Sequence, residues 1–267
     1  MNRPSWAFLA IDRAKVELKE FLRSREQMVF IFLFPVMLLV LFGSIFGGQE
    51  VAAGVSFGQY FLAGMIASGI MNTGFQSLAL GISSDRDADI LKRLHGTPMP
   101  STAYFAGKLV QVLFVSIVQI GLLITIGVAF YGVNLPSTAS AWGTFTWVFL
   151  LGTASSVALG IAMSSLLRNA RSGSAILTPV VLFLQFISGV FIVYTQVPVF
   201  LQHVASIFPL KWLAQGMRSV FLPASFESQE ATGSWQHGAA AIVLTVWFVV
   251  GTAISVRAFR WQRPEDR

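Results

Sequence analysis

Residues 28–47 read MVFIFLFPVMLLVLFGSIFG, a continuous apolar run without a charged side chain. An α-helix needs about 20 predominantly apolar residues to cross the hydrocarbon core of a bilayer, and this run has that length. Five more runs of similar character follow, so the sequence predicts an all-α polytopic membrane protein. The six predicted transmembrane helices are residues 28–47, 57–82, 103–131, 140–166, 172–194 and 237–257.

The amino-acid composition also indicates a membrane domain. The chain is 55% hydrophobic and 11% charged, with a mean hydropathy of +0.70, whereas about 25% of the residues of a typical soluble domain are charged. No long linker or low-complexity tract divides the sequence, so residues 1–267 are expected to form a single domain. The absence of cysteine excludes disulfides and thiolate metal sites. The basic residues are scattered, which argues against nucleic-acid binding.

The basic residues predict the orientation of the spans. Sixteen of the 18 Lys and Arg residues lie before the first span, between the second and third, between the fourth and fifth, or after the last. Basic residues near the ends of spans stay cytoplasmic. Both termini are therefore predicted to be cytoplasmic, in a multi-pass protein of the plasma membrane. Only Lys211 and Arg218 fall on the opposite side.

The segment before the first span, residues 1–27, is predicted to form an amphipathic helix in the cytoplasmic interface, in contact with membrane lipids. Apolar residues recur there at helical spacing, and charged residues occupy the other side. Arg13 and Glu17 are four residues apart and are expected to pair on that exposed face. The first span is read as an uncleaved anchor, because it has full span length and lacks a small-x-small end.

The predicted spans contain few strongly polar groups. No ionisable residue is expected at mid-membrane, where ion-coupled carriers usually keep one. Pro35 interrupts the first span, and a neighbouring helix is expected to satisfy the carbonyl that it leaves free. Five carboxamides are interpreted either as interhelical hydrogen bonds or as contacts along a transport pathway. They are Asn72, Gln76, Gln111, Gln119 and Gln185.

The predicted cytoplasmic segment 83–102 contains DRDADILKRLHGTP at residues 85–98. Its acidic start and basic end suit a short helix, which Thr97-Pro98 stops because proline disfavours helix in the residue before it. Ile90, Leu91 and Leu94 give this helix an apolar edge. Such a helix is either a solvated loop helix or one that docks into the groove of a partner.

This segment resembles the first cytoplasmic loop of ABC-2-type transporter permeases, which follows the pattern Arg-acid-x-Gly-x-Leu-x-x-Leu-x-x-Thr-Pro. Six residues match the pattern, while Asp89 stands where the family often has Gly. The matching residues are Arg86, Asp87, Leu91, Leu94, Thr97 and Pro98. The order of elements along the chain is similar as well, and daunorubicin-resistance-like drug exporters are the most similar subgroup. The resemblance implies a type V ABC exporter fold.

In that family the loop carries a coupling helix, received by a separate ATP-binding subunit. The resemblance therefore implies two copies of such a subunit as partners, together with a second copy of this permease or a related one. ATP and Mg would be used by the partner, with no cofactor bound by this chain. The coupling residues implied are Asp85, Arg86, Asp87, Asp89, Leu91, Lys92, Arg93, Leu94, Thr97 and Pro98.

Residues 195–236 are predicted to be an extracellular or re-entrant segment. Residues 198–208 and 209–222 are apolar, too short to span, and each begins with a proline suited to a helix start. The resemblance implies that these helices cap the exit of the pathway, although the aromatic residues also suit interfacial anchors. Lys211 and Arg218 share a helical face and are expected to reach headgroups or anionic ligands. The exit-gate candidates are Gly189, Phe191, Phe200, Pro209, Trp212 and Arg218.

Several catalytic motifs are missing from the sequence. It has no Gly-x-x-x-x-Gly-Lys-[Ser/Thr], so a P-loop for ATP is excluded, and it has no His-Glu-x-x-His or Gly-x-Ser-x-Gly. No metal site and no enzymatic site are expected. The resemblance implies the permease subunit of an ATP-driven exporter that moves an amphipathic drug, lipid or glycolipid outward. A polysaccharide or lipid-linked glycan exporter is the alternative, and an ion-coupled carrier is disfavoured.

Overall fold

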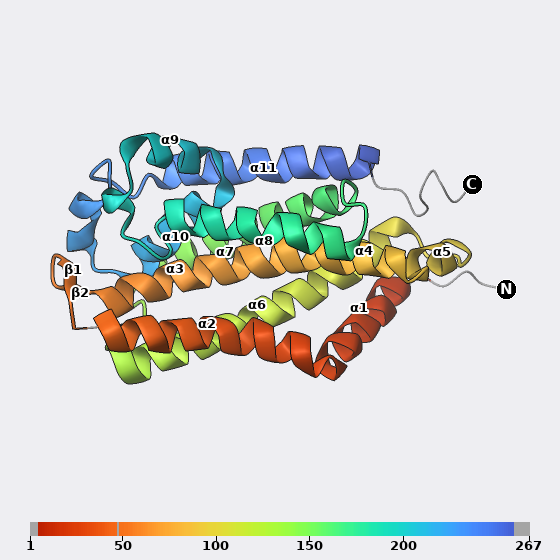
Figure 1. The fold of residues 1–267 in the computed structure, drawn as a ribbon, viewed down its shortest axis with the longest axis horizontal. Coiled ribbons are helices and arrows are strands. Elements are labelled where there is room, and N and C mark those ends of the chain that lie inside the picture. The colour runs from red at the N-terminus through yellow and green to blue at the C-terminus, as the bar shows by residue number, and fades with distance from the viewer. Residues whose placement is uncertain (1–4, 47, 259–267) are drawn as a thin grey trace.

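The computed structural model describes residues 5–46 and 48–258, which form an elongated bundle of helices (Figure 1). Two short strands are also present, β1 (Glu50–Ala52) and β2 (Val55–Ser56), which pair antiparallel. This hairpin was not predicted from the sequence. The α-helices are α1 (Trp6–Arg23), α2 (Arg25–Phe46), α3 (Phe57–Met71), α4 (Leu78–Asp87), α5 (Ile90–His95), α6 (Ser101–Tyr131), α7 (Ala139–Ser164), α8 (Ala170–Ile187), α9 (Val199–Ile207), α10 (Pro209–Phe221) and α11 (His237–Ala258).

Within the described residues, five helices are long and apolar enough to cross a membrane. They are α2, α6, α7, α8 and α11, and each corresponds to one predicted span. The remaining predicted span, 57–82, forms three consecutive helical segments: α3, the π-helix η1 (Asn72–Ser77) and α4. α3 is buried along most of its length, because α2, α6, α7 and α10 pack around it.

Local sequence signals set several helix boundaries. Ser56 and Gln59 form a capping box at the start of α3, in which each side chain satisfies a backbone N–H that has no helical partner. Asn169 caps α8 by accepting a hydrogen bond from the amide of Ser172. The predicted span 172–194 is too long, because α8 ends at Ile187 and Gly189 then adopts a left-handed φ of +77°.

Two glycines bring α7 very close to its neighbours. A Cβ atom on Gly160 would lie 2.5 Å from the carbonyl oxygen of Gly74 in η1, and one on Gly251 of α11 would lie 2.8 Å from the carbonyl carbon of Ala158. Small residues allow membrane helices to approach in this way, so that dispersion contacts hold the bundle together. α7 is accordingly the centre of the bundle, in contact with α3, α4, η1, α10 and α11.

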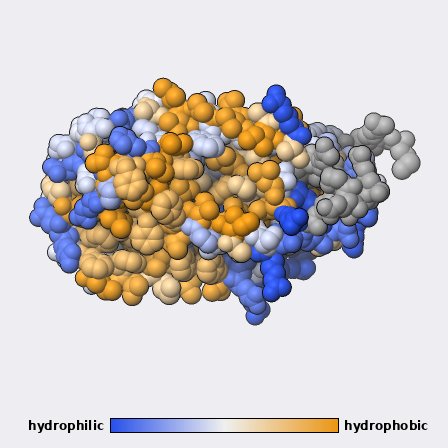
Figure 2. All heavy atoms as spheres, turned by 45° about the horizontal axis from the view of Figure 1, so that its top comes forward, coloured by the Kyte–Doolittle hydropathy of each residue, from blue (hydrophilic) through white to orange (hydrophobic). Residues whose placement is uncertain are grey.

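The face of the bundle shown in Figure 2 is apolar along its middle, with hydrophilic residues toward both ends. Large apolar side chains are exposed on the bundle as a whole, including Phe30, Phe130, Ile176, Ile242 and Val256. Monomeric soluble proteins rarely expose contiguous apolar surface on this scale, whereas lipid-facing helices require it. The fold is therefore that of an all-helical polytopic membrane protein.

The two ends of the bundle differ in what they carry. α5 lies at one end, where α1 begins and α11 ends, while the β1–β2 hairpin and α9 lie toward the other (Figure 1). The described chain thus starts and finishes at the same end of the bundle (Figure 1). The predicted helices 198–208 and 209–222 correspond to α9 and α10, the latter beginning at Pro209.

Candidate functional site

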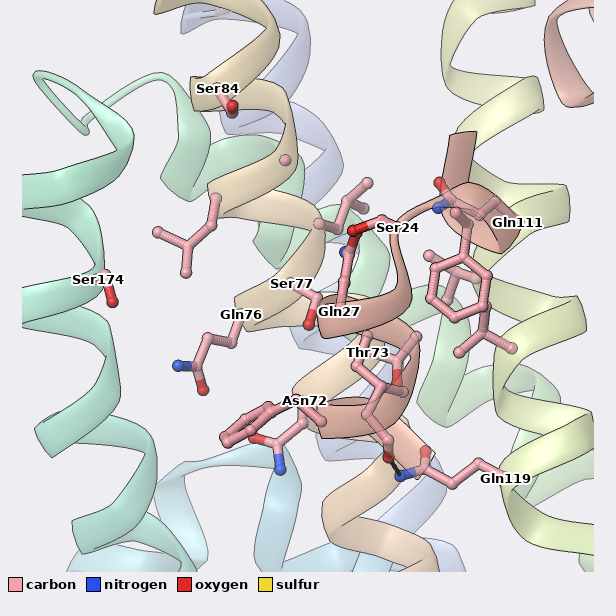
Figure 3. Close-up of a pocket in the computed structure, with 18 of the residues that line it drawn as sticks. Ser24, Gln27, Asn72, Thr73, Gln76, Ser77, Ser84, Gln111, Gln119 and Ser174 are labelled. Carbon is pink, nitrogen blue, oxygen red and sulfur yellow. Dashed lines mark hydrogen bonds between the residues drawn. The ribbon is translucent and has the colours of Figure 1, made fainter. Parts of the chain in front are cut away.

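A cavity of about 840 Å³ lies between α2, η1, α4, α6 and α8, with the end of α1 at its rim. This volume falls within the roughly 300–1,000 Å³ of sites that hold drug-sized ligands. All five carboxamides singled out in the sequence line this one cavity: Asn72, Gln76, Gln111, Gln119 and Gln185. They come from η1, α6 and α8, so only the folded bundle brings them together. Figure 3 labels Asn72, Gln76, Gln111 and Gln119 around this cavity.

Several of these carboxamides bridge helices. The amide nitrogen of Gln76 in η1 donates to the hydroxyl of Thr178 in α8 at 2.9 Å. That of Gln185 donates to Oδ1 of Asn72 at 3.3 Å. Interhelical hydrogen bonding is thus confirmed for these residues, while a role in a pathway stays a prediction. The side chain of Gln111 has no hydrogen-bond partner among residues 5–46 and 48–258.

The cavity wall contains the proline of the first span. Pro35 has no N–H, so the carbonyl of Ile31 loses its helical donor. Nε2 of Gln119 in α6 donates to that carbonyl at 3.0 Å (Figure 3). This confirms the expectation that a neighbouring helix satisfies the carbonyl freed by Pro35, and it explains why a polar side chain is buried at this depth.

The π-helix η1 places polar side chains on the cavity. Asn72, Thr73, Gln76 and Ser77 all belong to it and line the wall. π-helical turns are rare in proteins, but those that occur often lie at functional sites. The sequence predicts an uninterrupted span here, because no local residue pattern distinguishes a π turn from an α turn.

A cluster of buried charges closes one end of the cavity. It contains Arg13 and Glu17 of α1, Asp85 of α4, and Tyr104 and Lys108 of α6, and is called the α1 cluster below. Nζ of Lys108 lies 2.7 Å from Glu17 and 2.8 Å from Asp85. Arg13 also contacts both carboxylates, and the hydroxyl of Tyr104 donates to Asp85 at 2.7 Å. The two cations thus compensate the two carboxylates.

The α1 cluster corrects the prediction that Arg13 and Glu17 pair on an exposed face. They do pair, but only 5% of Arg13 and 1% of Glu17 is exposed. This face of α1 packs on α6, and the missing side chain of Gly107 allows the close approach. Side chains of opposite charge lie there. Burial raises the pKa of Glu17, while Lys108 and Arg13 act in the opposite direction. A helical wheel treats charge as solvent-facing and misses partners from distant elements.

The predicted coupling helix forms as α5, and its apolar edge packs on the protein itself. Leu91 is fully buried against Leu78, Ile82 and Tyr104, and Leu94 is half-buried beside them. This side of α5 is therefore already covered. The opposite side of α5, which carries Lys92 and Arg93, is exposed.

Arg86 and Asp87 tie the end of α4 to the connection between α7 and α8. A guanidinium nitrogen of Arg86 donates to the carbonyl of Ser164 at 2.7 Å. The carboxylate of Asp87 accepts from the backbone amide of Ala170 at 2.8 Å, at the N-terminus of α8, where negative charge is favourable. The two loops predicted to be cytoplasmic are thus held together, and Asp85 points inward into the α1 cluster.

The remaining predicted coupling residues are exposed: Asp89, Lys92, Arg93, Thr97 and Pro98. Thr97 closes the end of α5 by donating to the carbonyl of Leu94 at 2.7 Å. Asp89 has a left-handed φ of +57°, a conformation that favours glycine. This conformation explains how Asp can stand where the resembled pattern often has Gly, because Asp tolerates this region better than most residues.

Comparisons with known proteins agree with this geometry. The model of the family described as "ABC-2 type transporter" matches residues 14–222, from α1 to the end of α10. This chain belongs to the ABC-2 type transporter family. It is also similar to "Putative transport permease ycf38" of Porphyra purpurea, with 27% identity over 195 residues. That match covers 70% of this chain and 65% of the relative, so the chain spans less than two thirds of that protein.

At the other end of this ABC-2 family member, α10 carries a second group of buried charges. It comprises Lys211, Arg218, Glu230, Tyr60 and Tyr194, and is called the α10 cluster below. Arg218 is fully buried and donates to both oxygens of Glu230 at 2.6 and 3.0 Å. Its guanidinium also lies 5.1 Å from the ring centre of Tyr60.

The prediction that Lys211 and Arg218 reach headgroups is therefore wrong for the described structure. Only 4% of Lys211 is exposed, and its Nζ donates to Gln215 at 2.6 Å and lies 3.4 Å from the ring centre of Trp212. Burial lowers the pKa of Lys211 from 10.5 to about 8. Both cations point into the protein because Glu230 and the aromatic rings satisfy them there.

The exit-gate candidates do not gather at one point. Arg218 approaches the carbonyl of Gly189 at 3.5 Å. Trp212 is buried and donates to the carbonyl of Ser206 at 2.7 Å, whereas 66% of Phe200 is exposed on α9. Phe191 packs among Phe42, Phe61 and Phe186, and Pro209 is buried at the start of α10. No group of three or more metal-ligating side chains occurs among the described residues.

Proposed function

We propose that this chain is the membrane-spanning permease subunit of an ATP-driven exporter, which moves an amphipathic drug, lipid or glycolipid outward. A separate ATP-binding subunit docks on residues 83–98 and hydrolyses ATP with Mg. The observation that carries the proposal is the continuity from α5 through the α1 cluster to the cavity. Leu91 packs against Tyr104, Tyr104 binds Asp85, and Asp85 lines the cavity.

This continuity supports a mechanical link. A force on α5 passes to the end of α4 over a short connection. From there the α1 cluster transmits it to α1 and α6, the helices that border the cavity. Interactions that hold packed elements in discrete arrangements are the physical means by which such coupling travels.

The same proposal includes the topology. α3, η1 and α4 together make the sixth crossing, α9 and α10 are the re-entrant helices, and the end with α5 faces the cytoplasm of a plasma-membrane protein. Two such chains, or one with a related permease, assemble with two ATP-binding subunits. The positive charge at the α5 end, including Lys92, Arg93 and Arg171, supports this orientation.

The neutral cavity supports ATP as the energy source rather than an ion gradient. Its charged lining residues, Glu17, Glu20, Asp85 and Lys108, belong to the α1 cluster or to the rim beside it. The lining deeper in the described bundle offers carboxamides and hydroxyls. Proton- or ion-coupled carriers usually keep an intramembrane ionisable group for the relay.

Purification of the protein expressed with its neighbouring genes tests the proposal. We expect a co-purifying ATPase whose association weakens when Lys92→Glu and Arg93→Glu reverse the exposed charge of α5. Lys15→Glu with Lys19→Glu is the matched control, since both lysines are exposed on α1. Leu91 is unsuitable for this test because it is buried. A partnerless protein that transports under an ion gradient would contradict the proposal.

A further inference from the structure

We propose that the cavity receives an uncharged, hydroxyl-rich head group, such as a glycosyl group, of an amphiphile whose tail lies along α2 and α8. This inference rests on the proposed function and names the substrate class of the same site. Three features of the cavity carry it: unused carboxamide capacity, compensated charge and an aromatic wall.

The first feature is the hydrogen-bonding capacity left in the cavity. A carboxamide offers two donors and an acceptor. Gln76 uses one donor on Thr178, so its oxygen is still available. Gln185 likewise donates to Asn72, and Gln111 uses none of its groups on the described residues. Such groups match hydroxyls, which also both donate and accept.

The second feature is the absence of uncompensated charge deep in the described cavity. Among the described residues that line the cavity, Lys108 is the only cation, and two carboxylates already hold it at 2.7 and 2.8 Å. A phosphate would need to displace these carboxylates, because no other lining residue neutralises it. Deep in the cavity, a cationic head would meet Glu17 and Asp85 only after Lys108 and Arg13 had left them, and the third lining carboxylate, Glu20, is exposed at the rim. Burying a charge without a partner is costly, so a neutral head group fits best.

The third feature is the wall toward the surface of the bundle. Phe30 and Phe34 of α2 stack with ring centres 5.1 Å apart and both line the cavity. Leu182 of α8 lines it too, and 48% of this side chain is exposed. α2 and α8 make little contact with each other. An acyl chain can therefore leave the polar interior between apolar side chains that also face outward.

Binding to the full-length protein in lipid nanodiscs tests this inference. The probe is tritiated n-dodecyl-β-D-glucoside, measured by scintillation proximity and competed with unlabelled dodecyl maltoside, dodecyl phosphate and dodecyltrimethylammonium. All four amphiphiles share the C12 tail, and competition is compared at equal measured bilayer concentration, because charged head groups lower membrane partition. We expect dodecyl maltoside to compete at least tenfold better than either charged amphiphile.

Two variants locate the binding. Gln111→Leu breaks no hydrogen bond of the described structure, and Gln76→Leu removes the bond to Thr178. We expect each to weaken binding of the glucoside about tenfold, while Gln49→Leu, at an exposed carboxamide outside the cavity, leaves it unchanged. Thermal unfolding of each variant verifies that it is folded.

Equal competition by a charged amphiphile, or unchanged binding by folded Gln111→Leu and Gln76→Leu proteins, would overturn the inference. The assay needs no ATP-binding subunit. Binding as expected without any co-purifying ATPase would therefore defeat the proposed function alone, and an associated ATPase with no head-group preference would defeat this inference alone.

Discussion

The α1 cluster and the α10 cluster bury similar groups in different ways. Each contains two cationic side chains together with carboxylate and tyrosine side chains. In the α10 cluster one arginine holds one carboxylate with two parallel hydrogen bonds, 12 residues apart in sequence. In the α1 cluster two cations share two carboxylates from three helices, which are distant in the chain.

This difference separates a rigid joint from an adaptable one. A bidentate arginine–carboxylate pair has a single favourable geometry, so the α10 cluster fixes α10 to the segment that follows it. Two cations facing two carboxylates can exchange partners without leaving any charge uncompensated. The α1 cluster therefore suits the end of the cavity nearest to α5, where the proposed cycle requires movement.

The largest expected effect comes from breaking the rigid joint. Arg218→Ala leaves Glu230 buried without its cation, and removal of one partner of a buried ion pair costs about 3–5 kcal/mol. We expect a strong loss of thermal stability in detergent. Arg171→Ala, at an exposed arginine, is the control and should change little.

A double variant separates the contribution of the charges from that of side-chain packing. Arg218→Met combined with Glu230→Leu removes both charges, and apolar replacements of buried pairs are often neutral. We expect the double variant to recover most of the stability lost in Arg218→Ala. Equal instability of the single and double variants would show that shape, and not charge, dominates the α10 cluster.

The next effect tests the packing that brings α1 to its cluster. A Cβ atom on Gly107 would lie 2.7 Å from Cγ of Arg13 and 3.1 Å from the amide of Ala14. Gly107→Ala should push α1 from α6 and cost roughly 1–3 kcal/mol in thermal unfolding. Gly121→Ala in the same helix meets nothing within 4 Å. That control should be neutral or slightly stabilising, because alanine favours helix.

The pH dependence of the α10 cluster follows from Lys211. Burial lowers the pKa of its side chain from the ordinary value of 10.5 to about 8 in the folded protein. Between these pH values the unfolded state holds a proton that the folded state has released, so the free energy of unfolding rises with pH. We expect a rise of roughly 1–3 kcal/mol from pH 8 to 10.5. Lys211→Met should remove it, and Lys92→Met, at an exposed lysine, should keep it.

The α1 cluster should respond to pH with the opposite sign. Burial raises the pKa of Glu17 above 4.5, so just above pH 4.5 the folded state keeps a proton that the unfolded state has lost. Stability from this group therefore falls as pH rises through that window. The effect is smaller, because Lys108 and Arg13 oppose the shift. The free energy of unfolding, measured by chemical denaturation across this pH range, should depend less on pH in Glu17→Gln. It should keep its pH dependence in Glu20→Gln, which alters an exposed residue of the same helix.

The membrane fold was accessible from sequence because each element carries its own signal. Apolar length predicted the five described helices that are long and apolar enough to cross a membrane. Prolines marked the starts of α9 and α10, and the missing N–H of Pro35 required an outside donor. These signals are local. The π-helix was not predicted, because its backbone differs from an α-helix without a distinctive residue pattern.

The charge clusters were missed because their partners lie on different elements. Arg13 and Glu17 look exposed on a helical wheel, and only the packing of α6 supplies Lys108. Arg218 likewise appeared free until the chain returned with Glu230. The five carboxamides could be listed from sequence, but their gathering in one cavity depends on where three separate segments meet.

The smallest effect concerns Asp89, which is charged but belongs to neither cluster. Its φ of +57° costs less for glycine than for any residue with a Cβ atom. Asp89→Gly should therefore stabilise the protein by about 0.5 kcal/mol, after allowance for the greater freedom of the unfolded chain. Asp89→Ala should destabilise it by about 1 kcal/mol. If Asp89→Gly keeps stability but weakens binding of the ATP-binding subunit, the exposed carboxylate contributes to docking. If binding is unchanged, Asp89 serves only the turn between α4 and α5. Of these two acidic residues, Asp85 alone then contributes to the proposed movement, through the α1 cluster.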